Sequence, residues 1–186
     1  VMVAVPAQAA PKISNGVACT KSGATTKTSG GTYKCAKNPL VKNSKLTWLS
    51  LDCVTAATDA VKAEKSAITT AANFKAQLPV IELGITTETA NKAEIQVKLD
   101  AATLRLTAAQ AKLAAAKTDA DKRLLTTAVS SWTSATRAYA SKIRNIDLTI
   151  KKLEAAKLAA TNKPAELASN VTNARDSAKL ICTKGF

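Results

Sequence analysis

The chain has 186 residues and a net charge of +14; 46% of its residues are apolar, yet only 3% are aromatic. A core made largely of alanine is thin, so this composition favours long packed helices and excludes a large pocket. The sequence contains no histidine, the commonest general base and metal ligand, and no glycine motif that binds phosphate. It therefore predicts a non-enzymatic protein with no catalytic residues, no metal and no cofactor.

Residues 1–9 read VMVAVPAQA, an apolar run that ends in an Ala-x-Ala sequence. This pattern is typical of the end of a secretory signal peptide, although an ordinary apolar N-terminus would look similar. Four cysteines agree with export, because disulfides persist in oxidising compartments. No later stretch approaches the ~18 apolar residues of a membrane-spanning helix. We therefore expect a secreted, extracellular protein that associates with the cell surface.

Residues 10–50 form a lysine-rich segment with seven lysines and no acidic residue. Alternation on both sides of Ser29-Gly30-Gly31 predicts a β-hairpin, and Lys45 to Leu49 predicts a third strand. So small a sheet buries too little surface to hold itself together, and a Cys19–Cys35 disulfide would staple it. The basic side chains and one tryptophan are candidate contacts for a polyanion, namely Lys21, Lys27, Lys34, Lys37, Lys42, Lys45 and Trp48.

Two structural alternatives accompany that prediction. The lysines could form a solvated face that has no partner, and Trp48 could pack over the disulfide instead of stacking on a ligand. For Trp48, packing over the disulfide is the more usual role of such a residue, whereas the sequence does not decide between the two interpretations of the lysines.

Residues 16–48 resemble a small two-cysteine module. The resemblance is carried by Gly16-Val17-Ala18-Cys19-Thr20-Lys21-Ser22-Gly23, Thr32-Tyr33-Lys34-Cys35 and Lys45-Leu46-Thr47-Trp48. Modules of this kind recur on secreted and surface proteins of high-GC Gram-positive bacteria, attached to unrelated partners. The resemblance implies an extracellular setting, implies no particular activity or ligand, and does not extend to the helical part of the chain.

Residues 51–186 predict an elongated antiparallel bundle of four helices. Ser50 is a suitable N-cap for the first helix, Pro79 would end it, and Pro164 suits the first turn of the last helix. The sequence Thr118-Asp119-Ala120-Asp121 has the form of a capping box and separates the two middle helices. The predicted helices cover residues 51–77, 88–117, 119–161 and 164–183, with residues 80–87 as a connector.

The two middle helices carry the clearest heptad pattern. Apolar residues recur in four-three steps from Ile95 to Ala116 and again from Leu125 to Ala160. A shared period and a very short joint predict an antiparallel coiled-coil hairpin over residues 88–161. Trp132 and Tyr139 lie in this pattern, and we interpret them as packing residues opposite the first or last helix; a recognition platform is the alternative.

The remaining two cysteines pose a geometric problem. In a simple up-and-down bundle of these four helices, Cys53 and Cys182 would lie about 30 Å apart, too far for a disulfide. We therefore prefer a layout in which the first and last helices cluster at one end and residues 80–87 run back extended. This layout pairs Cys53 with Cys182, while the sequence leaves two other connectivities open.

Three hypotheses about function follow. The first is a secreted, non-enzymatic envelope spacer or adhesion protein whose basic segment anchors to an anionic polymer or polysaccharide. The second is self-assembly through the 88–161 hairpin into a filament or surface layer. The third is sequence-nonspecific binding of extracellular nucleic acid, for which the basic residues include Arg105, Arg123, Arg137, Arg144 and Arg175.

Overall fold

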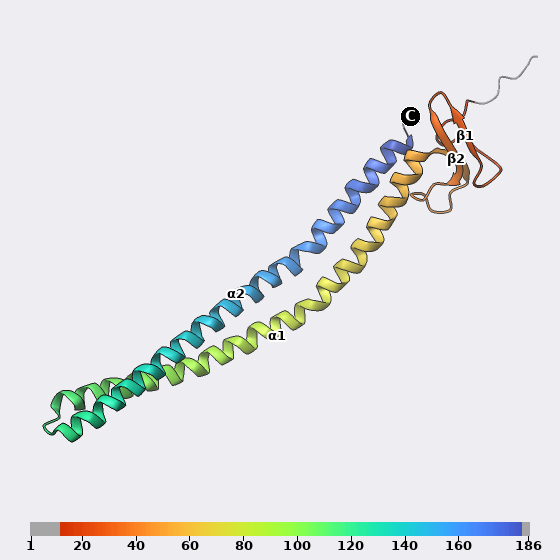
Figure 1. Cartoon of the computed structure of the whole chain (residues 1–186). Coiled ribbons are helices and arrows are strands. Elements are labelled where there is room, and N and C mark those ends of the chain that lie inside the picture. The colour runs from red at the N-terminus through yellow and green to blue at the C-terminus, as the bar shows by residue number, and fades with distance from the viewer. Residues whose placement is uncertain (1–11, 184–186) are drawn as a thin grey trace, which may run out of the picture. The chain divides into compact units, whose positions relative to one another are not determined.

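The computed structural model describes residues 12–183, and the predicted signal-peptide remnant at residues 1–9 lies outside them. Three short strands precede two long helices, α1 and α2, which pack as an antiparallel hairpin (Figure 1). The predicted fold class, mainly helical with a disulfide-stapled β module at the N-terminus, is therefore confirmed. The elements are β1 (Thr25–Thr28), β2 (Gly31–Lys37), β3 (Leu46–Ser50), α1 (Leu51–Ala115) and α2 (Asp119–Thr183).

The prediction of four separate helices is wrong, because each predicted pair is one continuous helix. α1 continues through Pro79 and through residues 80–87, where a connector was expected, and α2 continues through Pro164. A proline inside a helix leaves the carbonyl four residues earlier without its usual donor. Pro79 is exposed, so water can reach this part of α1. Packing of the surrounding turns against the other helix then outweighs the local preference to stop.

Gly84 illustrates how that packing works within the predicted connector. A β-carbon at this position would lie 3.3 Å from Cδ1 of Leu153 on α2. The missing side chain of Gly84 therefore allows α1 and α2 to approach closely at this position. Ion pairs on either side, Lys157 with Glu82 at 2.8 Å and Lys92 with Asp147 at 2.6 Å, also join the two helices.

The described residues divide into two compact units. The first holds residues 12–73 and 163–183, and therefore contains the sheet, the start of α1 and the end of α2. The second holds residues 74–162, the part of the helical hairpin that includes its turn. Among residues 12–183, neither helix has an apolar stretch of the length and hydropathy that could cross a bilayer.

In the first unit the sheet is antiparallel with the strand order β1-β2-β3; the sequence predicted the hairpin of the first two strands and the presence of a third, but not the order. Its core joins β3 to both helices: Leu49, Cys53, Ala57 and Cys182 are buried together. The two predicted disulfides, Cys19–Cys35 and Cys53–Cys182, are both formed. The predicted extended return over residues 80–87 does not exist, since two continuous antiparallel helices already bring residues 53 and 182 to the same level.

The start of α1 is fixed by two side chains. Oγ of Ser50 accepts a hydrogen bond from the Cys53 backbone N–H at 3.1 Å, which confirms the predicted N-cap. Asn15 accepts a bond from the Ser50 N–H at 2.6 Å and donates one to the Ile181 carbonyl at 3.3 Å. Asn15 thereby ties the segment before β1 to the beginning of α1 and to the end of α2.

In the second unit the predicted heptad seams face each other. Ile95, Ala102 and Ala109 of α1 are buried, as is Ile146 of α2. The helix α2 begins where the capping sequence was predicted: Oγ1 of Thr118 accepts a hydrogen bond from the Asp121 N–H at 3.1 Å. The hairpin over residues 88–161 is thus part of the structure, within longer helices than expected.

Candidate functional site

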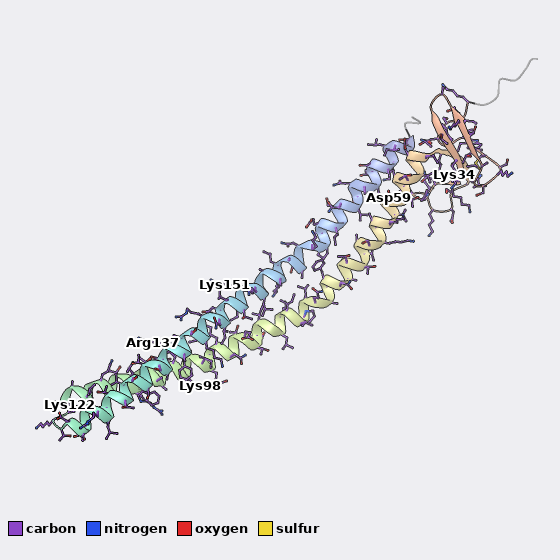
Figure 2. The ribbon with its side chains drawn as sticks, viewed as in Figure 1. Lys34, Asp59, Lys98, Lys122, Arg137 and Lys151 are labelled. Carbon is purple, nitrogen blue, oxygen red and sulfur yellow. A yellow bond between two sulfur atoms is a disulfide. The ribbon has the colours of Figure 1, made fainter. Side chains whose placement is uncertain are left out.

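The six candidate lysines lie on the sheet and on the two segments that flank it. Lys27 is on β1, Lys34 and Lys37 are on β2, and the other three are in loops before β1 and before β3. Five of the side chains are exposed, and Lys34, labelled in Figure 2, is half-buried. We call residues 12–50 the basic module.

Strand register decides which of these lysines share a face. Lys34 pairs with Thr25 and Lys27 pairs with Thr32, so Lys27 and Lys34 lie diagonally on one face of the sheet. Diagonal neighbours in an antiparallel pair are about 7–8 Å apart. Lys37 belongs to the opposite face. The lysines therefore surround the sheet instead of converging on one pocket.

The positive charge of the basic module is not neutralised within the described structure. None of the ion pairs among residues 12–183 includes a lysine of the module. The acidic residues of the chain all lie at position 52 or later. Uncompensated lysines of this kind create a positive potential that attracts polyanions.

The backbone of Trp48 is bonded on one side to β2 and on the other side to the segment before β1. It lies directly opposite Cys35 in the β2–β3 ladder, so its side chain shares a face with the Cys19–Cys35 disulfide. Its N–H donates to the Val17 carbonyl at 2.7 Å, and its carbonyl accepts from the Gly16 N–H at 3.0 Å. The indole is half-buried and lies on the same face of the sheet as Lys37, opposite the face that carries Lys27 and Lys34.

The five arginines are divided between the two units: Arg175 lies in the first unit, and the other four lie in the second. Arg175 forms an ion pair with Glu64 at 2.6 Å and donates to the Leu40 carbonyl at 3.3 Å, so it holds the loop before β3 against the helices. The Arg105 guanidinium lies 4.9 Å from the centre of the Trp132 ring. Trp132 therefore packs across the seam against α1 near residue 105, and not opposite the first or last predicted helix.

The other three arginines, together with one lysine, form a basic line on α2 in the second unit. They are exposed and follow a seven-residue period that is completed by Ser130. No hydrogen bond or ion pair within the described chain joins Arg137, Arg144 or Lys151 to an acidic side chain. Sequence reasoning missed Lys151, although the shared period would have found it. The basic line, two members of which are labelled in Figure 2, is Arg123, Arg137, Arg144 and Lys151.

Side chains of α1 and α2 in the first unit line an open cavity of about 230 Å³. Small and aliphatic side chains line it, and its one charged residue is Glu64, which already pairs with Arg175. Within residues 12–183, no group of His, Cys, Asp or Glu side chains is arranged to hold a metal ion. The cavity therefore brings together no set of polar groups suited to catalysis.

The chain was compared with protein-family models, with curated proteins and with solved structures, and it matches none of them.

Proposed function

We propose that this is an exported, non-enzymatic protein of the cell envelope whose basic module binds an anionic polymer. The two 65-residue helices would act as the spacer that carries the module. The observation that supports this proposal is the cluster of exposed lysines on a stapled sheet, with no acidic residue between positions 10 and 50.

The distribution of the lysines favours a long, flexible polymer over a compact ligand. Because they occupy both faces of the sheet and two loops, a small anion could contact only a few of them at once. A chain of carboxylates or phosphates can follow the surface and neutralise several lysines together, with release of counterions. Lysine ammonium groups act as point charges and need no fixed bidentate geometry.

The fixed conformation of the basic module should strengthen its binding to a polyanion. The Cys19–Cys35 disulfide and the two hydrogen bonds of Asn15 hold the module in one conformation before it meets a ligand. Binding to a preorganised surface loses less conformational entropy than binding to a flexible lysine-rich tail. The half-buried Trp48 would add a stacking contact if the polymer contains sugar rings.

The basic line on α2 supports a second candidate function, nonspecific binding of nucleic acid. Members of the line that are seven residues apart rise about 10.5 Å along the helix axis. Such contacts would reach phosphates and not base edges, so they would be blind to sequence. This candidate uses a different surface from the basic module, which makes the two separable.

Two matched variants of the full chain test these functions. K27Q/K34Q/K42Q/K45Q removes four charges from the module, and R123Q/R137Q/R144Q/K151Q removes four from the basic line. At about 0.1 M salt, we expect the module variant to bind alginate and polyphosphate roughly 10- to 100-fold more weakly and with a shallower salt dependence. The α2 variant should bind these two polymers like the wild type.

Binding is measured by co-sedimentation or fluorescence anisotropy over a salt series, with a 30-base-pair DNA duplex as a third probe. Retention of the unsubstituted protein at ~1 M salt would contradict an electrostatic anchor. Loss of alginate and polyphosphate binding in the α2 variant alone would move the site to the basic line. Circular dichroism shows whether each variant keeps its fold.

A further inference from the structure

The outward face of α1 in the second unit is apolar and uncovered. Four of its large aliphatic side chains are strongly exposed: Val80 at 70%, Leu83 at 66%, Val97 at 69% and Leu104 at 72%. Isolated exposed leucines are common on protein surfaces, but a regular row of aliphatic residues is not. The arrangement of these four residues along the helix therefore needs an explanation.

The four residues belong to a second heptad pattern, on the side of α1 that points away from α2. The buried seam of α1 runs through Ile95, Ala102 and Ala109. Two residues after Ile95 and Ala102 come Val97 and Leu104, and the same seven-residue line contains only aliphatic residues from Ala76 to Ala111. We call it, with its neighbouring line, the outer stripe: Ala76, Leu83, Ala90, Val97, Leu104 and Ala111, flanked by Val80, Thr87, Glu94, Ala101 and Ala108.

The outer stripe has the composition of a helix-packing seam. Positions that face solvent in a two-stranded coiled coil are normally polar or charged, as they are on the basic line of α2. The outer stripe mixes large aliphatic residues with alanines, and such a mixture lets a facing helix approach and interdigitate. Glu94 is its one charged member, and Lys98 of the same helix pairs with it.

We propose that the outer stripe binds a second copy of this chain, with the two α1 helices packed antiparallel about a midpoint near residue 92. An antiparallel pair with this midpoint places Leu83 opposite Ala101 of the other copy, and Leu104 opposite Val80. Leu83 then meets a small residue, and Leu104 meets a second aliphatic side chain. A parallel pair in register would instead place Glu94 opposite Glu94, which like-charge repulsion disfavours.

Charge on the edge of the stripe also favours the antiparallel arrangement. The basic residues of that edge, Lys98, Arg105 and Lys112, all lie in its C-terminal half. In an antiparallel pair the same edges of the two helices lie side by side. The basic half of one copy would then lie beside the neutral half of the other, which contains Gly84 and Asn91.

The size of the stripe is sufficient for a specific but modest interface. From Ala76 to Ala111 it is about 52 Å long at ~1.5 Å per residue, and a helix face is about 10 Å wide. Two copies would therefore bury roughly 1,000 Å² in total, near the lower limit for a biological interface. A membrane surface fits less well, because residues 76–111 contain no aromatic residue and include Glu94 and Asp100.

Sedimentation equilibrium of the full chain tests the proposal with two matched variants. L83Q/L104Q removes two large residues of the outer stripe. The control L124Q/L158Q removes two leucines of α2 with similar exposure, 72% and 63%. We expect the wild type and the control to show a concentration-dependent dimer, and L83Q/L104Q to dimerise at least about 100-fold more weakly.

Because the substituted leucines are exposed, helix content and thermal midpoint should be unchanged in both variants. A wild type that stays monomeric at high concentration overturns the proposal, as does a control that loses the dimer to the same extent as L83Q/L104Q. Binding of the monomer to vesicles containing anionic lipid, lost in L83Q/L104Q, would assign the stripe to a membrane and would also overturn it.

Crosslinking tests the direction of packing. All four cysteines of the described residues are in disulfides, so a crosslinker for thiols reacts there only with a cysteine that is introduced. Ala90→Cys lies near the midpoint and should be joined to its own copy by a short bismaleimide. Ala111→Cys should not be, because an antiparallel pair separates the two thiols by roughly 57 Å along the axis. Equal crosslinking at both positions would indicate parallel packing and overturn the proposal.

Discussion

Asn15 joins the basic module to both helices through two hydrogen bonds. Its amide accepts the Ser50 N–H and donates to the Ile181 carbonyl, and Ser50 is only 5% exposed. A backbone donor this deeply buried cannot exchange a lost partner for water without a penalty. The asparagine therefore acts as a bracket between the segment before β1 and both helix ends.

Replacing Asn15 with alanine should lower the free energy of unfolding by about 1–3 kcal/mol, because the Ser50 N–H would lose its acceptor. Urea denaturation followed by tryptophan fluorescence measures the change. Asn145→Ala is the control, since Asn145 is exposed on α2, and it should change the midpoint little. Equal midpoints for the two variants would show that the bracket contributes nothing to stability.

The ion pair between Glu94 and Lys98 shifts the pKa of both side chains, and these shifts make its contribution to stability depend on pH. A hydrogen bond from Lys98, followed by its charge, holds the pKa of the Glu94 carboxyl below its usual range. The same contact raises the pKa of Lys98 above its usual range. Both side chains are exposed, so salt should weaken both effects.

The signs follow from linkage. The contribution of Glu94 to stability is present above the ordinary glutamate pKa and is lost as pH falls through the lowered value. The contribution of Lys98 is present below the ordinary lysine pKa and is lost as pH rises through the raised value. In an NMR titration, Lys98→Gln should therefore raise the pKa of Glu94 toward its ordinary value. An unchanged titration curve would show that the two side chains do not interact in solution.

At the scale of elements, the Cys53–Cys182 disulfide joins the start of α1 to the end of α2 across a sequence separation of 129 residues. Constraining so long a loop removes much of the conformational freedom of the unfolded chain. The disulfide also lies in the core that links β3 to the helices, beside Leu49 and Ala57. It therefore fixes the end of the hairpin that carries the basic module.

The double variant C53A/C182A should lose about 2–5 kcal/mol of unfolding free energy, as removal of a native disulfide from a small domain usually does. Hydrogen exchange should show the loss of protection first in the first unit, near β3 and residues 51–57. The variant C19A/C35A serves as the comparison, since it should loosen the sheet while α2 keeps its protection. A C53A/C182A variant as stable as the parent would refute a stabilising role for this disulfide.

At the scale of the whole molecule, three surfaces of different chemistry occur on one chain. The basic module has exposed lysines and no acidic residue, α2 carries the basic line, and α1 carries the outer stripe. Each surface predicts a different class of partner: a polyanion, nucleic acid or a second copy. The variants described above change one surface at a time, so their effects can be assigned separately.

The sequence by itself determined the local features of this protein. Polar alternation and glycines placed the strands, Ser50 and Thr118 placed two helix starts, and the heptad period identified the residues that are buried between α1 and α2. These features depend on interactions between residues close in the chain, or on a period that only one secondary structure satisfies. Both preferred disulfides are formed, but the sequence had left two other connectivities open, and it had paired Cys53 with Cys182 through an extended return that does not exist.

Only the tertiary structure decided where the helices continue and which residues join distant segments. Pro79 and Gly84 are helix breakers by local rules, but α1 continues through both, and there it meets α2 at Gly84 with Leu153 and in the Glu82–Lys157 ion pair. The partners of Asn15 and Arg175 are far away in the sequence, and no local pattern specifies them. Likewise, the heptad period places Leu104 off the seam between the helices, but only the packed molecule shows that its side chain is left 72% exposed.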